Sequence, residues 1–123
     1  MRVIARNWRS ARDRRDEADL LALSPDGALL IVVEVKRAAG PWDALERVDG
    51  RKREVLWRLL CDLEECVRRA RTGAPARGDP PRLAAVRRIR VDLVGVEGSA
   101  RHSMVSRQVT ALFEREVSRR GGS

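Results

Sequence analysis

The chain has 123 residues, the length of one small domain with a modest hydrophobic core. Apolar residues make up 43% of it and charged residues 36%, which is typical of a folded protein with a hydrated surface. No apolar run approaches the length of a membrane span, and the N-terminus has no signal-peptide pattern, so a cytoplasmic protein without membrane contact is expected.

The formal net charge is +8, and the basic residues are 24 arginines and 2 lysines. Charge of this sign favours a polyanionic partner, because each phosphate that Arg or Lys neutralises releases condensed counterions. Nucleic acid, DNA above all, is therefore the expected partner. The alternative is that the arginines reflect coding bias and form a solvated surface together with the 18 acidic residues.

The first third of the chain predicts three strands. Residues 2–9 carry Val3, Ile4 and Trp8 and indicate a short strand, which a polar connection follows. Residues 17–24 and 28–36 are two β-rich runs on either side of Pro-Asp-Gly. An Asp-Gly dipeptide between apolar runs is the strongest short-range hairpin signal.

The middle of the chain predicts one long helix over residues 50–71, with Asp49 as its N-cap. Its apolar residues recur at helical spacing and predict one buried face. Cys61 and Cys66 would lie roughly 8 Å apart on this helix, too far for a disulfide, so free thiols are expected.

The last third predicts a loop, a strand and a second helix. Residues 72–82 are rich in Pro and Gly and indicate a flexible loop. Residues 86–97 fit a partly buried strand, and residues 103–120 allow an amphipathic helix that leads into the tail at 118–123. No boundary divides the chain, so residues 1–123 are expected to form one domain. His102 is the only histidine, which makes a histidine-centred catalytic site improbable.

The predicted hairpin gathers charged residues at its open end. If Asp26 and Gly27 form a two-residue turn, Asp19 lies opposite Glu34 and Glu17 lies opposite Lys36. All four then share one face, because side chains alternate along a strand. The other face is apolar, which predicts that helices cover both sides of the sheet.

Two opposed carboxylates in such a partly buried place repel each other unless a proton, a cation or a metal compensates. Mg²⁺ suits this pattern, since it takes oxygen ligands from one or two carboxylates and leaves positions for water and phosphate. The alternative is a surface hairpin whose carboxylates pair with Lys36 and nearby arginines.

Three cations stand at the predicted start of the helix: Arg51, Lys52 and Arg53. Cations at a helix N-terminus oppose the macrodipole, so local stability does not explain them. Binding of an anion does, because amide groups and cations would converge on one phosphate.

Five segments resemble, in chain order, the YraN family of resolvase-like candidate endonucleases, within the PD-(D/E)XK nuclease superfamily. These segments are ARNWR (5–9), DEADLLAL (16–23), IVVEVKR (31–37), VDGRKREVL (48–56) and RVDLVGV (90–96). The resemblance implies an α/β fold of the restriction-endonuclease-like kind, with a mixed central sheet flanked by helices in the order β-β-β-α-β-α.

The resemblance also implies a role for each motif residue. Asp19 and Glu34 would bind Mg²⁺ or Mn²⁺, with the Val35 carbonyl as a further ligand. Lys36 would hold or activate the attacking water and stabilise charge on the phosphate. Glu17 would be an auxiliary or indirect ligand, and Lys52 would face the site from the first turn of the helix.

The chain departs from the family at its N-terminus. Family members usually begin with a helix whose Gly-Glu glutamate is thought to complete the metal site, whereas this sequence begins directly on the first strand. Three explanations stay open: a mis-assigned start, a homodimer or partner protein that covers the exposed face, or a degenerate member of the family.

The leading hypothesis is a metal-dependent endonuclease that hydrolyses phosphodiester bonds in DNA, with branched or junction DNA as one candidate substrate. The alternatives are a catalytically degenerate nucleic-acid-binding module of the same fold and a protein-interaction domain. The candidate contacts to the DNA backbone are Arg6, Arg9, Arg51, Lys52 and Arg53.

Overall fold

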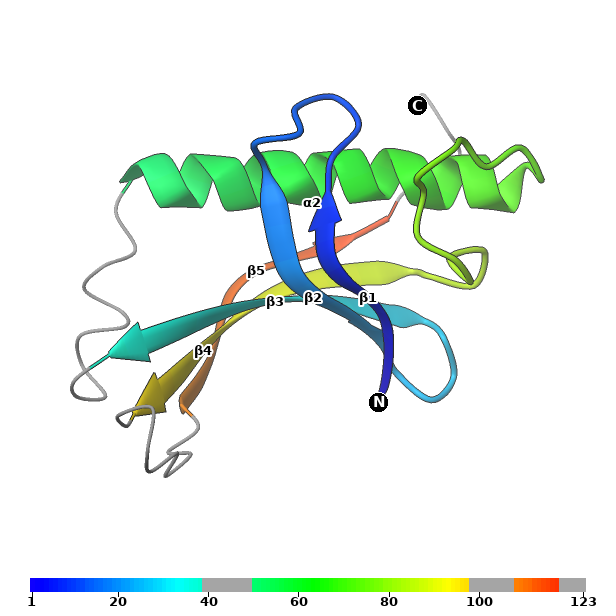
Figure 1. Cartoon of the computed structure of the whole chain (residues 1–123). Coiled ribbons are helices and arrows are strands. Elements are labelled where there is room, and N and C mark those ends of the chain that lie inside the picture. The colour runs from blue at the N-terminus through cyan, green and yellow to red at the C-terminus, as the bar shows by residue number, and fades with distance from the viewer. Residues whose placement is uncertain (39–49, 98–107, 118–123) are drawn as a thin grey trace.

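The computed structural model describes residues 1–38, 50–97 and 108–117; of residues 36–38, 95–97 and 108–112 it describes the backbone alone. These residues form five strands and one long helix (Figure 1). In chain order the elements are β1 (Arg2–Arg9), β2 (Glu17–Leu23), β3 (Leu29–Ala38), α2 (Gly50–Arg71), β4 (Arg88–Glu97) and β5 (Gln108–Glu116). The helix and the first four strands were all predicted, with boundaries within a few residues.

The strands form one mixed sheet in the order β1-β2-β3-β4-β5. Neighbouring strands are antiparallel except β3 and β4, which are parallel. A parallel pair needs a crossover connection, and α2 lies between these two strands in the chain. The mixed α/β class predicted from the sequence is therefore confirmed.

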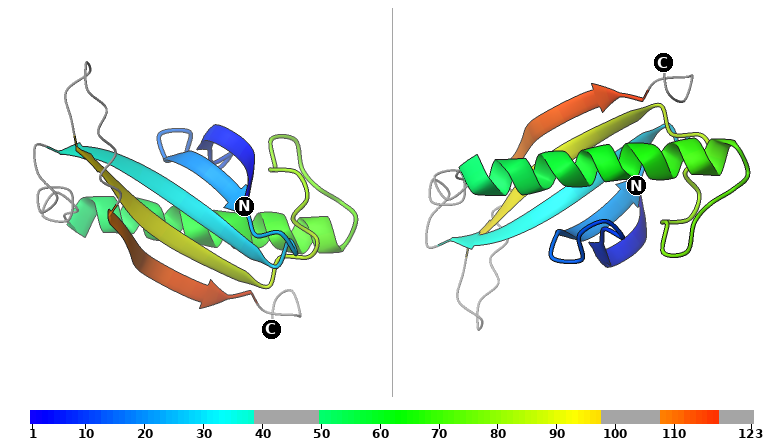
Figure 2. Two further views of the ribbon diagram at one scale, coloured as in Figure 1. Left: turned by 90° about the horizontal axis from the view of Figure 1, so that it is seen from below. Right: turned by 90° about the horizontal axis from the view of Figure 1, so that it is seen from above.

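Helix α2 packs across one face of the sheet (Figures 1 and 2). Its apolar residues follow the 3.6-residue period, so they form one stripe, and Leu56, Leu59, Leu60 and Leu63 are fully buried. They pack with alternate residues of the strands, namely Leu21, Leu23, Leu30 and Val32 from the central hairpin and Ile89 and Val91 from β4.

The prediction of helices on both faces is not met by the described residues, which contain this one helix on one face. On the other face Ile31 is nevertheless buried. The register places it opposite Arg90, whose guanidinium forms an ion pair with Asp92 at 2.8 Å.

Within the described residues, no helix has the length and apolar character needed to cross a membrane.

The central hairpin has the predicted register but a longer turn. Leu23 lies opposite Leu30 and Leu20 opposite Val33, as the Asp-Gly signal predicted. The amide of Ser24 donates to the carbonyl of Leu29, so four residues and not two form the connection. Gly27 has a φ of 74°, a conformation that costs glycine little. The longer turn takes one more residue from each strand, so the same residues still lie opposite each other. Each side chain therefore stays on the face of the sheet that the two-residue turn predicted.

The predicted C-terminal helix is wrong, because residues 108–116 form β5. The spacing of Val109, Phe113 and Val117 fits a helix, but β4 has an open edge whose main-chain groups need partners. Phe113 and Arg115, two residues apart, both contact Trp57 of α2: the Phe113 ring edge-on at 5.6 Å and the guanidinium at 5.7 Å. Two-residue spacing toward one contact is the period of a strand.

Both cysteines are free thiols on α2, as predicted. Cys66 is buried, which raises the pKa of its thiol to about 12, and Cys61 is half-buried. His102 and Asp49 lie outside the described residues.

Candidate functional site

Strands β2 and β3 separate at the end of the hairpin away from the turn. Regular pairing ends at Leu20 opposite Val33. Just beyond, Oδ2 of Asp19 accepts a hydrogen bond of 2.8 Å from the amide of Val35. That carboxylate takes the place of a main-chain acceptor, so Asp19 is held at the peptide bond between Glu34 and Val35. This side-chain link replaces the predicted pairings of Asp19 with Glu34 and of Glu17 with Lys36.

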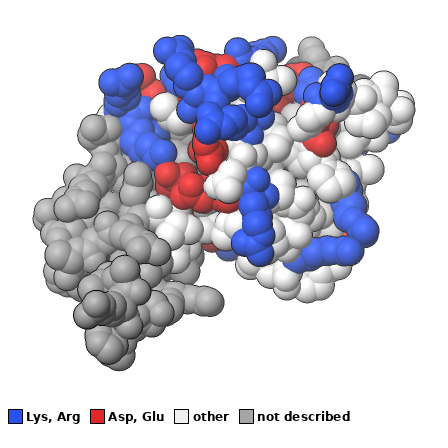
Figure 3. Space-filling model, in the orientation of Figure 1, with Lys and Arg blue, Asp and Glu red and all other residues white. Residues whose placement is uncertain are grey.

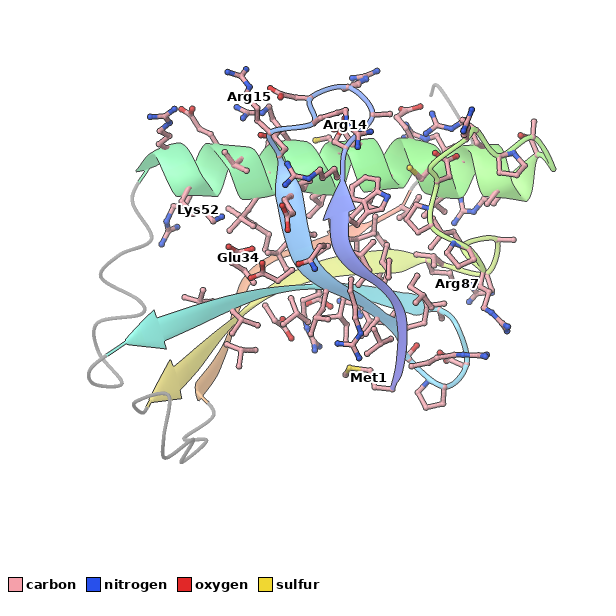
Figure 4. All side chains as sticks on the ribbon, viewed as in Figure 1. Met1, Arg14, Arg15, Glu34, Lys52 and Arg87 are labelled. Atoms are coloured by element: carbon pink, nitrogen blue, oxygen red, sulfur yellow. The ribbon has the colours of Figure 1, made fainter. Side chains whose placement is uncertain are left out.

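Glu34 points from β3 toward the helix and meets Lys52 (Figure 4). Lys52 Nζ lies 2.7 Å from Glu34 Oε1. The Glu34 side chain is only 6% exposed and that of Lys52 is 26% exposed, so the pair is largely removed from water. Period-two alternation puts Glu34 on the same face as Leu30 and Val32, and that face packs on α2. The sheet and the first turn of the helix thus bring together two residues that are distant in sequence.

Glu17 lies at the start of β2, opposite Arg9 of β1. Arg9 Nη2 lies 2.8 Å from the Glu17 carboxylate, and Arg9 Nη1 donates to the carbonyl of Arg14 at 2.7 Å. Two of the predicted site residues, Arg9 and Glu17, therefore form an ion pair with each other. Arg9 still has a side chain about half exposed, at 47%.

Lys36 lies in β3, where its backbone pairs with Gly95 of β4. Its side chain lies outside the described part of the structure, and its role stays a prediction. The backbone of Val35, between Glu34 and Lys36, is held in place because its amide donates to the Asp19 carboxylate.

Asn7 is a residue that the sequence did not single out. The pairing of Arg6 with Leu20 and of Trp8 with Ala18 sets Asn7 opposite Asp19. Its φ is 50°, in the left-handed region, where Asn is the most tolerant residue after glycine. The available signal was an Asn in the middle of a predicted strand, between Arg6 and Trp8, since Asn is depleted in strands.

Positive charge surrounds the acidic residues on this side of the molecule. Figure 3 shows acidic atoms near the middle of the face, with Lys and Arg side chains above and to the left of them. Of the predicted backbone contacts, Arg6 on β1 and Arg51 and Arg53 on the first turn of α2 are exposed. The surface could therefore attract a phosphate chain to the acidic centre.

The donor atoms available here suit a hard divalent cation. Asp19 and Glu34 offer carboxylate oxygens, which Mg²⁺ and Mn²⁺ prefer. Glu34 already holds a cation, the ammonium of Lys52, in a place shielded from water. Residues 1–38, 50–97 and 108–117 contain no group of three or more His, Cys, Asp or Glu placed to hold a metal. Two carboxylates suffice for Mg²⁺, which usually keeps several waters.

A five-stranded mixed sheet with one covering helix, and an acid pair where two strands separate, is consistent with the restriction-endonuclease-like fold. Residues 1–96 match the model of Uncharacterised protein family UPF0102, which is the YraN family of resolvase-like candidate endonucleases. The chain belongs to this family. No curated protein and no solved structure gives a significant match.

Proposed function

We propose that this protein is a metal-dependent endonuclease that hydrolyses phosphodiester bonds in DNA, with branched or junction DNA as a candidate substrate. The observation that carries the proposal is the shielded ion pair between Glu34 and Lys52, set beside Asp19 at the point where β2 and β3 separate. Membership of a nuclease-like family supports it.

The two carboxylates would hold Mg²⁺ or Mn²⁺, with the Val35 carbonyl as the additional protein ligand. A bound divalent cation at this place would supply an activated water and neutralise charge on the phosphate. Lys36 is proposed to orient that water, as the resemblance implies. Lys52 is proposed to move from Glu34 to a phosphate oxygen, since its compact ammonium suits both partners.

The surrounding arginines support nucleic acid as the substrate. Arg6 on β1 and Arg51 and Arg53 on the first turn of α2 are exposed, and Figure 3 shows Lys and Arg side chains above and to the left of the acidic atoms. Contacts of this kind position a phosphate backbone and carry no sequence information. The proposal therefore predicts binding that depends on salt and on DNA structure more than on DNA sequence.

Cleavage of a supercoiled plasmid and of a four-way junction, in Mg²⁺ or Mn²⁺, tests the proposal. We expect cleavage by the wild type, and a loss of at least 100-fold in Glu34→Gln and Asp19→Asn, because one metal ligand loses its charge in each. Glu114→Gln is the matched control, since Glu114 is an exposed carboxylate on β5 that pairs with Arg88.

Cleavage that is unchanged in both site variants would contradict the proposal. Salt-dependent DNA binding by a wild type that never cleaves would instead select the non-catalytic binding module. Failure to bind DNA at low salt would favour the protein-interaction domain.

A further inference from the structure

We propose that the loop between β1 and β2, residues Ser10–Asp16, is a second contact for the phosphate backbone of duplex DNA, made through Arg12 and Arg14. We call this segment the arginine loop. The inference rests on the proposed function, and it adds a substrate-positioning surface outside the residues predicted for the site.

The arginine loop is built to hold one conformation. Ser10 is fully buried, and its hydroxyl donates to the carboxylate of Asp62 on α2. Asp16 is 3% exposed, and both of its oxygens accept hydrogen bonds of 2.9 Å from the Arg58 guanidinium of α2. Both ends of the loop are therefore fastened to the helix by charged hydrogen bonds, which are stronger than neutral ones.

Main-chain hydrogen bonds close the loop between these two anchors. The amide of Ser10 donates to the carbonyl of Asp16, and the amide of Asp16 to the carbonyl of Asp13. The amide of Arg12 donates to the Ser10 hydroxyl oxygen. An ordered loop loses little conformational entropy when it binds a ligand.

The loop uses this rigidity to present cations to solvent. The Arg12 side chain is 78% exposed, and its nearest carboxylate, Asp62, is 3.9 Å away. Arg14 is exposed and forms no ion pair with any residue in the described ranges. Arg15, by contrast, is held by Asp13 through two hydrogen bonds. Within the described ranges Arg12 and Arg14 thus have a single ion pair, the long one from Arg12 to Asp62, which leaves their charge available to an anion.

The position of the loop relative to the acidic centre fits a DNA strand. Both lie on the face seen in Figure 4, where Arg14 and Arg15 stand above the helix and Glu34 and Lys52 below it. The anchors Arg58 and Asp62 lie about 9 Å and 15 Å along α2 from Lys52. That span equals roughly three to four nucleotides of one strand of B-DNA. A strand with one phosphate at Glu34 and Lys52 could thus place a flanking phosphate at the loop.

The test is equilibrium binding of a 30-base-pair DNA duplex in EDTA, over a range of salt concentrations, so that cleavage plays no part. We expect Arg12→Ala/Arg14→Ala to bind more weakly than the wild type and to reduce the slope of log K against log salt by about 2. The control is Arg2→Ala/Arg87→Ala, which should leave the slope unchanged. Both arginines are exposed; Arg2 lies opposite Leu23 at the turn end of the hairpin, and Figure 4 shows Arg87 well away from Glu34 and Lys52. Neither pair of side chains is buried, so all proteins should fold, which the thermal midpoint verifies.

The outcomes separate this inference from the proposed function. If the wild type binds and cleaves DNA while Arg12→Ala/Arg14→Ala has the wild-type affinity and salt slope, the loop proposal alone is overturned. If the wild type shows no salt-dependent binding, the proposed function falls and the loop proposal with it. In cleavage assays the loop variant should raise KM and leave kcat unchanged; a lower kcat at saturating DNA would contradict a positioning role.

Discussion

Lys52 Nζ lies 2.7 Å from Glu34 Oε1, and this contact joins the first turn of α2 to the middle strand of the sheet. Breaking such a pair leaves a carboxylate in a poorly hydrated place. The ammonium contacts Glu34 Oε1, one of the oxygens that we propose as metal ligands. If Glu34 binds a metal as proposed, this one contact couples the stability of the fold to the affinity for that metal.

Lys52→Met should have opposite effects on stability and on metal binding. Without metal, we expect a loss of about 1–3 kcal/mol in the free energy of unfolding, because the largely buried ion pair between Lys52 and Glu34 is removed. With Mg²⁺ or Mn²⁺, the variant should bind more tightly than the wild type, because the Lys52 ammonium no longer competes for Glu34 Oε1. Thermal midpoints measured during a metal titration check both effects. Lys52→Arg, which retains the charge, should resemble the wild type in stability, and equal metal affinity in all three proteins would refute the competition.

Asp19 offers a way to separate a structural from a chemical role. Asp19→Ala removes the acceptor of the Val35 amide and should lower the free energy of unfolding by about 1–2 kcal/mol. Asp19→Asn retains an oxygen acceptor and should be nearly as stable as the wild type while losing metal-dependent cleavage. Urea denaturation and the plasmid assay measure the two effects. Full activity in a stable Asp19→Asn protein would show that the carboxylate serves only the backbone.

Asn7 should tolerate glycine better than a branched residue. Its φ of 50° is unfavourable for a side chain branched at Cβ, so Asn7→Val should cost about 1–2 kcal/mol. Asn7→Gly should leave stability unchanged or slightly higher. If the Asn7 amide contacts the substrate opposite Asp19, Asn7→Gly will raise KM for DNA although it folds normally. Equal stability of the two variants would contradict the strain argument.

Asp79 fastens the loop of residues 72–82 to α2, and this contact should depend on pH. Its carboxylate accepts two hydrogen bonds of 2.9 Å from Arg69 and one of 2.8 Å from the amide of Ala76. The Arg69 guanidinium holds the pKa of Asp79 below its usual 3.8. Because the folded pKa lies below the unfolded one, this stabilisation is complete above pH 3.8 and is lost as the pH falls through the folded pKa.

Asp79→Asn should therefore lower the urea midpoint at pH 7 and weaken its dependence on pH below about 4. The measurement is urea unfolding at several pH values between 7 and 2. Glu116→Gln is a suitable control, because Glu116 is an exposed carboxylate at the end of β5. A pH dependence identical to that of the wild type would show that Asp79 contributes nothing through its charge.

The sequence predicted those parts of the fold that local patterns determine. The register of the hairpin follows from alternation and from the Asp-Gly turn, and the limits of α2 follow from its apolar period. The strand β5 could not be predicted in this way, because its apolar spacing fits a helix as well and the open edge of β4 decided between them. The length of the turn could not be predicted from the pattern of the strands either, since a four-residue and a two-residue turn give the same register.

The candidate site was predictable in its residues and less so in its geometry. Strand alternation placed Glu34 on a buried face, and the family resemblance pointed to Lys52. The separation of β2 from β3 at Asp19 depends on one side-chain hydrogen bond to Val35, which no periodic pattern records. The left-handed conformation of Asn7 and the anchoring of the arginine loop by Ser10 and Asp16 are likewise tertiary features.

Titration of Mn²⁺ into the DNA-free protein, with free Mn²⁺ followed by its electron paramagnetic resonance signal, tests most directly whether Glu34 is a metal ligand. We expect a binding site that is present in the wild type and in Glu114→Gln and is lost in Glu34→Gln. Binding that is the same in all three proteins, or that is lacking in the wild type, would contradict a metal site at Glu34.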